Sequence, residues 1–163
     1  MRSRTRGVKI GEILVQHGVL TPAEVREVLS VQRRTGRPFG ELAETLFGVP
    51  PDAVEEAWIT QYVRTVGLTD LDRLKVDPAC LSVVNRRQAW QFHVLPVSRQ
   101  RGELTLATDE ASLTRTLLFA TRAIREPVFL RVAAPRQLRD YLMRYYPVPR
   151  ELAELSDRLA RLN

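Results

Sequence analysis

Apolar and polar residues in the first third of the chain alternate with a helical period. Ile10, Ile13 and Leu14 lie at i, i+3 and i+4, which predicts a short helix that stops at Gly18. The run Thr21-Pro22-Ala23-Glu24 is typical of a helix start, with Thr21 as N-cap, proline at the first helical position and glutamate at the third. The pattern therefore predicts two helices, the second of which ends at Gly36.

The same block then occurs a second time. Residues 11–32 read GEILVQHGVLTPAEVREVLSVQ, and residues 40–61 read GELAETLFGVPPDAVEEAWITQ. The two blocks align without a gap, so that Gly11 matches Gly40 and Gln32 matches Gln61. A repeat of this length is one helix–turn–helix unit used twice. A doubled unit predicts a pseudo-symmetric surface that suits a partner or ligand that is itself doubled.

The pattern changes from about residue 67. A connector leads to a helical stretch that begins at Asp77-Pro78, and residues 92–98, 103–108 and 127–133 read as strands. Helices are predicted between the second and third strands and from Pro135 onward. The order ββαβα predicts an α+β fold: tandem helical hairpins followed by a small lobe with helices packed on a three-stranded sheet.

Three segments are expected. They are a tandem helix–turn–helix subdomain over residues 1–66, a small α/β subdomain over residues 67–147 and a helical tail over residues 148–163. The tail carries a leucine stripe at Leu152, Leu155, Leu159 and Leu162. A stripe this short fits either packing on its own domain or packing on a partner helix.

Charge indicates an anionic partner without specifying one. The 163 residues carry a formal net charge of +6, with basic clusters at Arg2, Arg4, Arg6 and Lys9 and at Arg33, Arg34 and Arg37. Such clusters favour nucleic acid, nucleotide phosphate, lipid head groups or an acidic protein, and they also fit a plain solvated surface. No apolar run approaches the ~20 residues that span a bilayer, and the single cysteine fits a reducing compartment. We expect a cytoplasmic protein without direct membrane insertion.

No arrangement of residues indicates catalysis. His17 and His93 are the only histidines, and with one cysteine they give no zinc-ligand spacing. The phosphate-loop pattern G-x-x-x-x-G-K-[ST] does not occur. We expect no enzymatic activity and no required cofactor.

The repeat identifies a family resemblance. In each unit a glycine is preceded by an apolar residue, a second glycine follows, and two apolar residues four apart precede a glutamine three positions later. This pattern resembles the N-terminal domain of type II secretion and type IV pilus assembly ATPases, in which the form that binds cyclic di-GMP carries it twice. The stretch HVLPVSRQRGELTLATDE and the closing YLMRYYP are similar to the α/β part of that domain, so that the resemblance covers roughly residues 7–147. In the family an ATPase core follows, so we expect either a stand-alone homologue or an excised N-terminal piece.

The resemblance implies a cyclic di-GMP site across the paired units. Its residues would be Lys9, Ile10, Gly11, Gly18, Val25, Leu29 and Gln32 in the first unit, Arg37, Phe39, Gly40, Val54, Trp58 and Gln61 in the second, and Asp109 after the second strand. Glycines admit close approach of a ligand, basic side chains pair with phosphate, and glutamine can read a base edge.

Both units depart from the pattern of the family. Lysine replaces the usual arginine at Lys9, and the matching position of the second unit is Pro38, which has no charge. Phe47 stands opposite Gly18, with Gly48 displaced by one residue. The same glycines, apolar residues and glutamines also fit a purely structural role in stacking the two hairpins.

The resemblance predicts a regulatory domain that docks to secretion, pilus or motility machinery, for example to the cytoplasmic part of an inner-membrane component, with cyclic di-GMP as candidate ligand. The alternative is a nucleic-acid-binding helix–turn–helix protein. Against the alternative, the second helices carry the acids Glu24, Glu27, Asp52, Glu55 and Glu56, which would face phosphates. We therefore do not expect a nucleic-acid partner.

Overall fold

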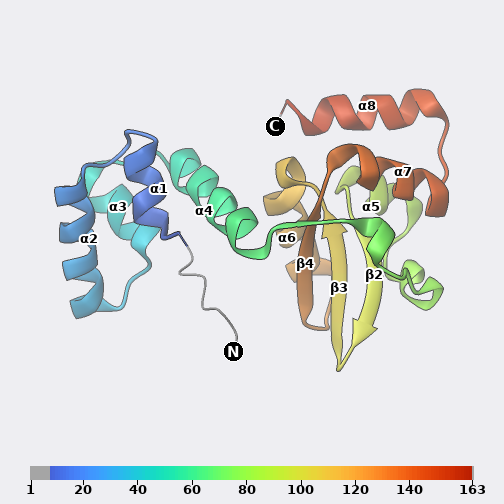
Figure 1. Ribbon diagram of the computed structural model, residues 1–163, viewed down its shortest axis with the longest axis horizontal. Coiled ribbons are helices and arrows are strands. Elements are labelled where there is room, and N and C mark those ends of the chain that lie inside the picture. The colour runs from blue at the N-terminus through green and yellow to red at the C-terminus, as the bar shows by residue number, and fades with distance from the viewer. Residues whose placement is uncertain (1–7, 163) are drawn as a thin grey trace. The chain divides into compact units, whose positions relative to one another are not determined.

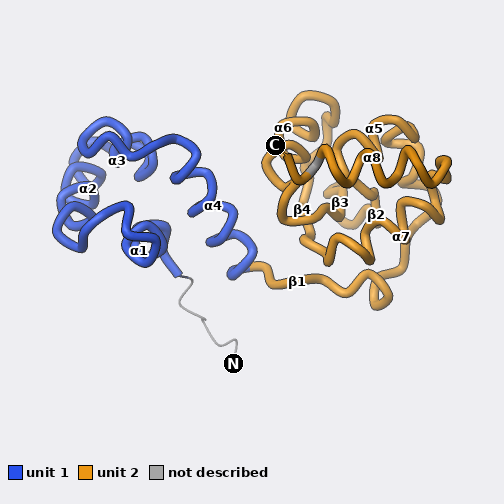
Figure 2. Tube along the Cα trace, turned by 90° about the horizontal axis from the view of Figure 1, so that it is seen from above, with its two compact units in different colours: residues 1–65 blue, residues 66–163 orange. Residues whose placement is uncertain are grey.

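The computed structural model describes residues 8–162, which form two compact units, residues 1–65 and residues 66–163 (Figure 2). The basic residues Arg2, Arg4 and Arg6 lie outside the described residues.

The first unit consists of four helices: α1 (Ile10–Gln16), α2 (Pro22–Thr35), α3 (Phe39–Phe47) and α4 (Pro51–Val66) (Figure 1). The predicted signals shape α2. The side chain of Thr21 accepts a hydrogen bond from the backbone N–H of Glu24, the Glu24 carboxylate accepts from the backbone N–H of Thr21, and Gly36 ends the helix at φ +70°. The two hairpins of the repeat are therefore formed locally by their own capping residues.

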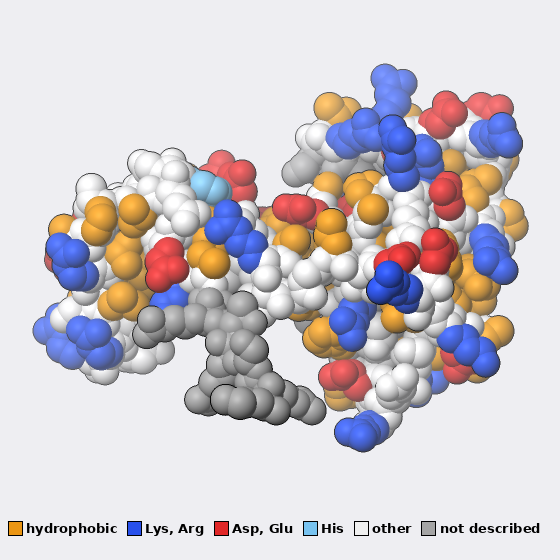
Figure 3. All heavy atoms as spheres, in the orientation of Figure 1, with side chains coloured by type: hydrophobic (Ala, Val, Ile, Leu, Met, Phe, Trp, Pro, Cys, Tyr) orange, Lys and Arg blue, Asp and Glu red, His pale blue; other side chains and the backbone are white. Residues whose placement is uncertain are grey.

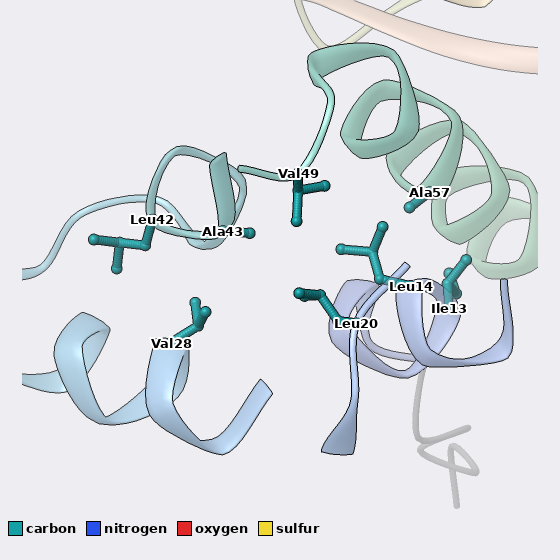
Figure 4. Close-up of a cluster of buried hydrophobic side chains, with 8 residues drawn as sticks. All are labelled: Ile13, Leu14, Leu20, Val28, Leu42, Ala43, Val49 and Ala57. Atoms are coloured by element: carbon teal, nitrogen blue, oxygen red, sulfur yellow. The ribbon is translucent and has the colours of Figure 1, made fainter. Parts of the chain in front are cut away.

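The core of this unit is built from pairs of equivalent residues. Eight side chains form the buried cluster shown in Figure 4. The alignment of the two repeat units relates them as four pairs: Ile13 with Leu42, Leu14 with Ala43, Leu20 with Val49, and Val28 with Ala57. The backbone follows the same rule, because Leu20 N–H donates to Leu14 O at 3.3 Å and Val49 N–H donates to Ala43 O at 3.4 Å. The repeat in sequence is thus a repeat in three dimensions, with one shared core.

The second unit contains a four-stranded sheet of β1 (Leu68–Thr69), β2 (Leu95–Gln100), β3 (Glu103–Thr108) and β4 (Val128–Ala133) in the order β1-β4-β3-β2. β2 and β3 form an antiparallel hairpin, and β4 runs parallel to both β3 and β1. α6 (Leu113–Ala123) connects β3 to β4, and α7 (Pro135–Tyr145) follows β4. α5 (Arg86–Gln91) precedes the hairpin, and α8 (Arg150–Ala160) closes the chain. Short 3-10 turns lie at Leu71–Arg73, Pro78–Val83 and Glu110–Ser112.

The α+β fold class is confirmed, and three details differ from the sequence-based expectation. β1 is a fourth strand that arises from the expected connector and pairs with β4 through two residues only. The helical stretch at Asp77-Pro78 is a 3-10 turn, and α5 starts separately with its own N-cap at Asn85. The first long strand starts at Leu95 and not at residue 92, because His93 has φ 47°, which no extended strand accommodates.

The tail helix α8 packs on its own unit, but not through its leucines. Ala153 is its buried apolar residue, with 4% of its surface exposed, and α8 lies beside α5. Leu152, Leu155 and Leu159 are 55%, 49% and 53% exposed. The leucine stripe therefore faces outward on this unit.

Candidate functional site

The first glycine of each repeat unit allows two helices to pack closely. A Cβ atom on Gly11 would lie 2.9 Å from Cγ1 of Val25, and one on Gly40 would lie 2.6 Å from Cγ1 of Val54. Real Cβ contacts this short force a shift of the neighbour. In each hairpin, therefore, the short helix meets the long helix at a position where only glycine fits without rearrangement. Phe39 also lies against Gly11, so α1, α2 and α3 meet at this point.

The two glutamines connect the repeat units to each other. Nε2 of Gln32 donates to the carbonyl oxygen of Arg37 at 3.2 Å, and Nε2 of Gln61 donates to that of Val8 at 3.1 Å. Val8 and Arg37 are themselves equivalent when the repeat alignment is extended. Each glutamine thus joins the end of its own long helix to the backbone that leads into the short helix of the other unit. The two hairpins close on each other by matching bonds.

One apolar position of each long helix remains partly uncovered. Leu29 and Trp58 are equivalent, and both are half-buried. Leu29 lies on the same face of α2 as Val25 and Gln32, and Trp58 lies on the same face of α4 as Val54 and Gln61. These two residues are the part of the predicted site that could cover a planar base.

The basic residues of the predicted site differ in their contacts. Lys9 is the exposed N-cap residue of α1, with Ile10 following it as the first helical residue. Arg37 is exposed and forms an ion pair with Glu41 at 2.6 Å. The hydrogen bond from Arg37 to Glu41 and the charge of that carboxylate raise the pKa of Arg37 above its usual value. An anion would therefore find Lys9 accessible and would have to compete with Glu41 for Arg37.

The second glycine of each repeat unit adopts a left-handed backbone conformation. Gly18 has φ +69° and Gly48 has φ +63°, and a Cβ atom at either would meet no atom within 4 Å. Both follow the end of a short helix, where a left-handed residue reverses the chain. Gly48 lies one residue later in its unit than Gly18 does, but both glycines reverse the chain after a short helix.

Asp109 belongs to the second unit and is buried there. Its Oδ2 lies 2.9 Å from Nδ1 of His93, and its Oδ1 accepts the backbone N–H of Ser112 at 2.8 Å. Burial opposes the charged form, but the hydrogen bond and charge of His93 and the hydrogen bonds from Ser112 hold the pKa of Asp109 below its usual range. The structure engages both carboxylate oxygens within this unit.

Sequence reasoning missed the network that continues from Asp109. Nε2 of His93 lies 3.1 Å from Oγ of Ser156 on α8, and Asp157 pairs with Arg139 at 2.8 Å. A Ser–His–Asp order is the order of a hydrolytic triad, but the Ser156 hydroxyl donates to the carbonyl oxygen of Trp90 at 2.9 Å. Its proton is therefore directed away from His93, so the network serves to hold α8 on the unit. His93 and Ser156 are 63 residues apart, and no local signal in the sequence links them.

Within residues 8–162 no group of three or more His, Cys, Asp or Glu side chains could hold a metal ion. Among the helices that the structure describes, none is long and apolar enough to cross a membrane.

Comparisons with known proteins point to one family. The MshEN domain model matches residues 64–152, more than half of the chain, and leaves both blocks of the tandem repeat outside the match. The type IV pilus assembly ATPase PilB of Thermus thermophilus is 22% identical over 150 residues, which cover 92% of this chain and 16% of that protein. The chain thus spans about one sixth of the length of this curated relative.

Two solved structures align with most of the chain. A structure of MshE with cdg aligns at 23% identity and a TM-score of 0.49, over 85% of this chain and 99% of that one. The N-terminal domain of XpsE aligns at 21% identity and a TM-score of 0.47, over 90% of this chain and 99% of that one.

The close contact at Gly40 gives a stability prediction. We expect Gly40→Ala to lower the free energy of unfolding by about 1–3 kcal/mol, because the new methyl group overlaps Val54. Val54→Ala removes the atom that the new methyl group would overlap. The loss of unfolding free energy in the double variant Gly40→Ala/Val54→Ala should therefore be smaller than the sum of the two single losses, by roughly 0.5 kcal/mol or more. Urea unfolding followed by circular dichroism measures all three. Strict additivity would contradict the contact.

The buried Asp109 predicts a pH dependence. Its folded pKa is depressed, so its stabilising effect is present above the unfolded pKa of about 4 and is lost as pH falls through the folded pKa. We expect Asp109→Asn to lower the free energy of unfolding by about 1–3 kcal/mol at pH 7, and the difference from the parent to shrink below pH 4.

The measurement is urea unfolding in a Trp58→Phe background, where Trp90 fluorescence reports the second unit. Glu110→Gln, at the exposed neighbouring acid, is the matched control and should change little. A difference that is the same at every pH would contradict an ionised Asp109.

Proposed function

Because the chain belongs to the MshEN domain family, we propose that it is a non-catalytic regulatory domain that docks to secretion, pilus or motility machinery and senses cyclic di-GMP through its tandem repeat. The match to PilB covers 16% of that ATPase, so docking and sensing are proposed here for this domain alone.

The pairing of equivalent residues in the first unit carries the proposal for a ligand. Cyclic di-GMP is two guanine nucleotides joined in a ring, so its halves are equivalent. A protein surface related by a pseudo-twofold axis can offer the same contacts to both halves. The four core pairs and the two matching glutamine bonds place equivalent residues in both repeat units, which supports a doubled ligand.

Each repeat unit supplies one half of the proposed site. Leu29 or Trp58 would cover a guanine face, and the amide carbonyl of Gln32 or Gln61, which takes no part in the glutamine's bond to the backbone, would accept a hydrogen bond from the base edge. Lys9 supplies positive charge for phosphate in the first half. Pro38 stands at the matching position of the second half and has no charge. Arg37 can supply positive charge for phosphate there only if its ion pair with Glu41 breaks.

Isothermal titration of the full chain with cyclic di-GMP tests the proposal. We expect saturable binding, and we expect Gln32→Ala and Gln61→Ala each to weaken it about tenfold or more, the loss of one or two hydrogen bonds. The glutamine variants also remove a hydrogen bond between the hairpins and could weaken binding through the fold. Trp58→Ala removes none of these bonds and should still weaken binding. Gln100→Ala, at an exposed glutamine of the second unit, is the control. Absence of heat at high micromolar ligand would remove cyclic di-GMP as the ligand.

Docking is tested separately. We expect the tagged chain to co-purify with the recombinant cytoplasmic part of an inner-membrane secretion, pilus or motility protein encoded in the same genome. Recovery of none of these proteins, from a chain shown to be folded by circular dichroism, would contradict the proposed docking.

A further inference from the structure

A groove with apolar walls and arginines along its lining lies between α5 and α8 of the second unit. It has a volume of about 530 Å³ and apolar walls formed by Trp90, Val148, Leu152, Leu155 and Leu159. Trp90 is held in place because its indole N–H donates to the carbonyl oxygen of Tyr146 at 2.7 Å. Figure 2 shows α8 running beside α5 along this part of the unit. The groove thus has a fixed floor and an uncovered leucine edge.

The leucines are not the only residues that hold α8 in place. α8 is also attached by the buried Ala153, by the bonds of the groove-lining Ser156 to His93 and to Trp90, and by the ion pair of Asp157 with Arg139. The three groove leucines are each about half exposed on a helix that is already fixed. A concave, contiguous apolar surface of this kind is typical of an interaction site.

The charge around the groove has one sign. Arg86, Arg87 and Arg115 line it, and no Asp or Glu is among the described residues that do so. Nε of Arg115 is buried and has no hydrogen-bond partner among the described residues, although its Nη2 donates to Ser112. The guanidinium of Arg115 is thus held at the wall of the groove, where its positive charge adds to those of Arg86 and Arg87.

We propose that this groove binds an amphipathic helix of a partner protein, with apolar side chains seated on the leucines and acidic side chains against the three arginines. This inference rests on the docking part of the proposed function and does not depend on nucleotide binding by the first unit. It corresponds to helix-in-groove recognition, where affinity comes from a ridge of apolar anchors and orientation comes from the flanking charges.

Two other occupants fit less well. A flat anionic lipid surface would also approach the exposed acids Glu151 and Glu154 of α8, and Figure 3 shows acidic as well as basic side chains over this helix. A second copy of α8 would bring its own Arg158 and Arg161 toward the three arginines of the groove. A single acidic helix is narrow enough to lie along the groove, where its acids meet the lining arginines and no lining acid.

The test uses the full chain and two synthetic peptides. Each is a helix of about 15 residues with leucines at i, i+3, i+4 and i+7; one carries glutamates beside the leucines, and the other carries lysines there. Fluorescence anisotropy measures affinity, and the indole N–H signal of Trp90 in a ¹H–¹⁵N spectrum reports where the peptide binds. We expect the glutamate peptide to bind, to shift the Trp90 signal, and to bind at least about tenfold more tightly than the lysine peptide.

Two variants place the interaction in the groove. Leu155→Asp should weaken the glutamate peptide at least about tenfold, whereas Leu118→Asp, at a leucine of α6 that is 52% exposed and outside the groove, should leave it unchanged. Arg87→Glu should weaken the glutamate peptide and strengthen the lysine peptide. Equal binding of both peptides, or equal effects of Leu155→Asp and Leu118→Asp, would overturn the inference.

The remaining outcomes separate the alternatives. Binding to phosphatidylserine vesicles that Leu155→Asp abolishes would assign the groove to a membrane, and a dimer in solution that the same variant dissociates would assign it to a second copy. Either result would overturn the inference. If the chain does not bind the glutamate peptide but still co-purifies with a machinery component, the inference about the groove is wrong and the proposed docking stands. A chain that binds the peptide but recovers no component would contradict the proposed docking alone.

Discussion

The first unit depends on one constraint: neither hairpin of the repeat can bury its apolar face alone. Each contributes four side chains to the buried cluster, and every one of them has its equivalent at the matching position of the other hairpin. Short helices are marginal in isolation and gain their stability from packing. In three of the four pairs the larger member, Leu14, Leu20 or Val28, comes from the first hairpin. The two hairpins thus share one fold, and the first supplies more of the volume of the common core.

This constraint separates the repeated residues into two groups. Packing accounts for Gly11 and Gly40, because a Cβ atom at either would strike a valine of the neighbouring helix. Hydrogen bonding between hairpins accounts for one end of Gln32 and Gln61. Neither explains Leu29, Trp58 or Lys9, which remain partly or fully accessible at the same surface. These three residues are thus the part of the predicted site that contacts between the hairpins leave unexplained.

Sequence patterns predicted the elements whose signals are local. The repeat, the cap at Thr21 and the strand at residues 103–108 appear as expected, because each depends on neighbours within a few residues. β1 could not be predicted, since two residues become a strand only when β4 lies beside them. The late start of β2 follows from the left-handed backbone of His93, a residue without the usual glycine signal. The link from Asp109 through His93 to Ser156 joins three distant segments, and only the fold brings them together.

The rotation of α8 about its own axis is not the one that would bury the most apolar surface. Full burial of one leucine contributes about 1.5–3 kcal/mol, so a helix selected only for stability would turn Leu152, Leu155 and Leu159 inward. Instead, the polar residues Ser156 and Asp157 face the unit and find partners in His93, Trp90 and Arg139. Buried polar contacts of this kind have strict geometry, and they fix one rotation where apolar packing would tolerate several. The network therefore explains why the leucines stay outside: it gives up part of their burial energy and holds them at the edge of a basic groove.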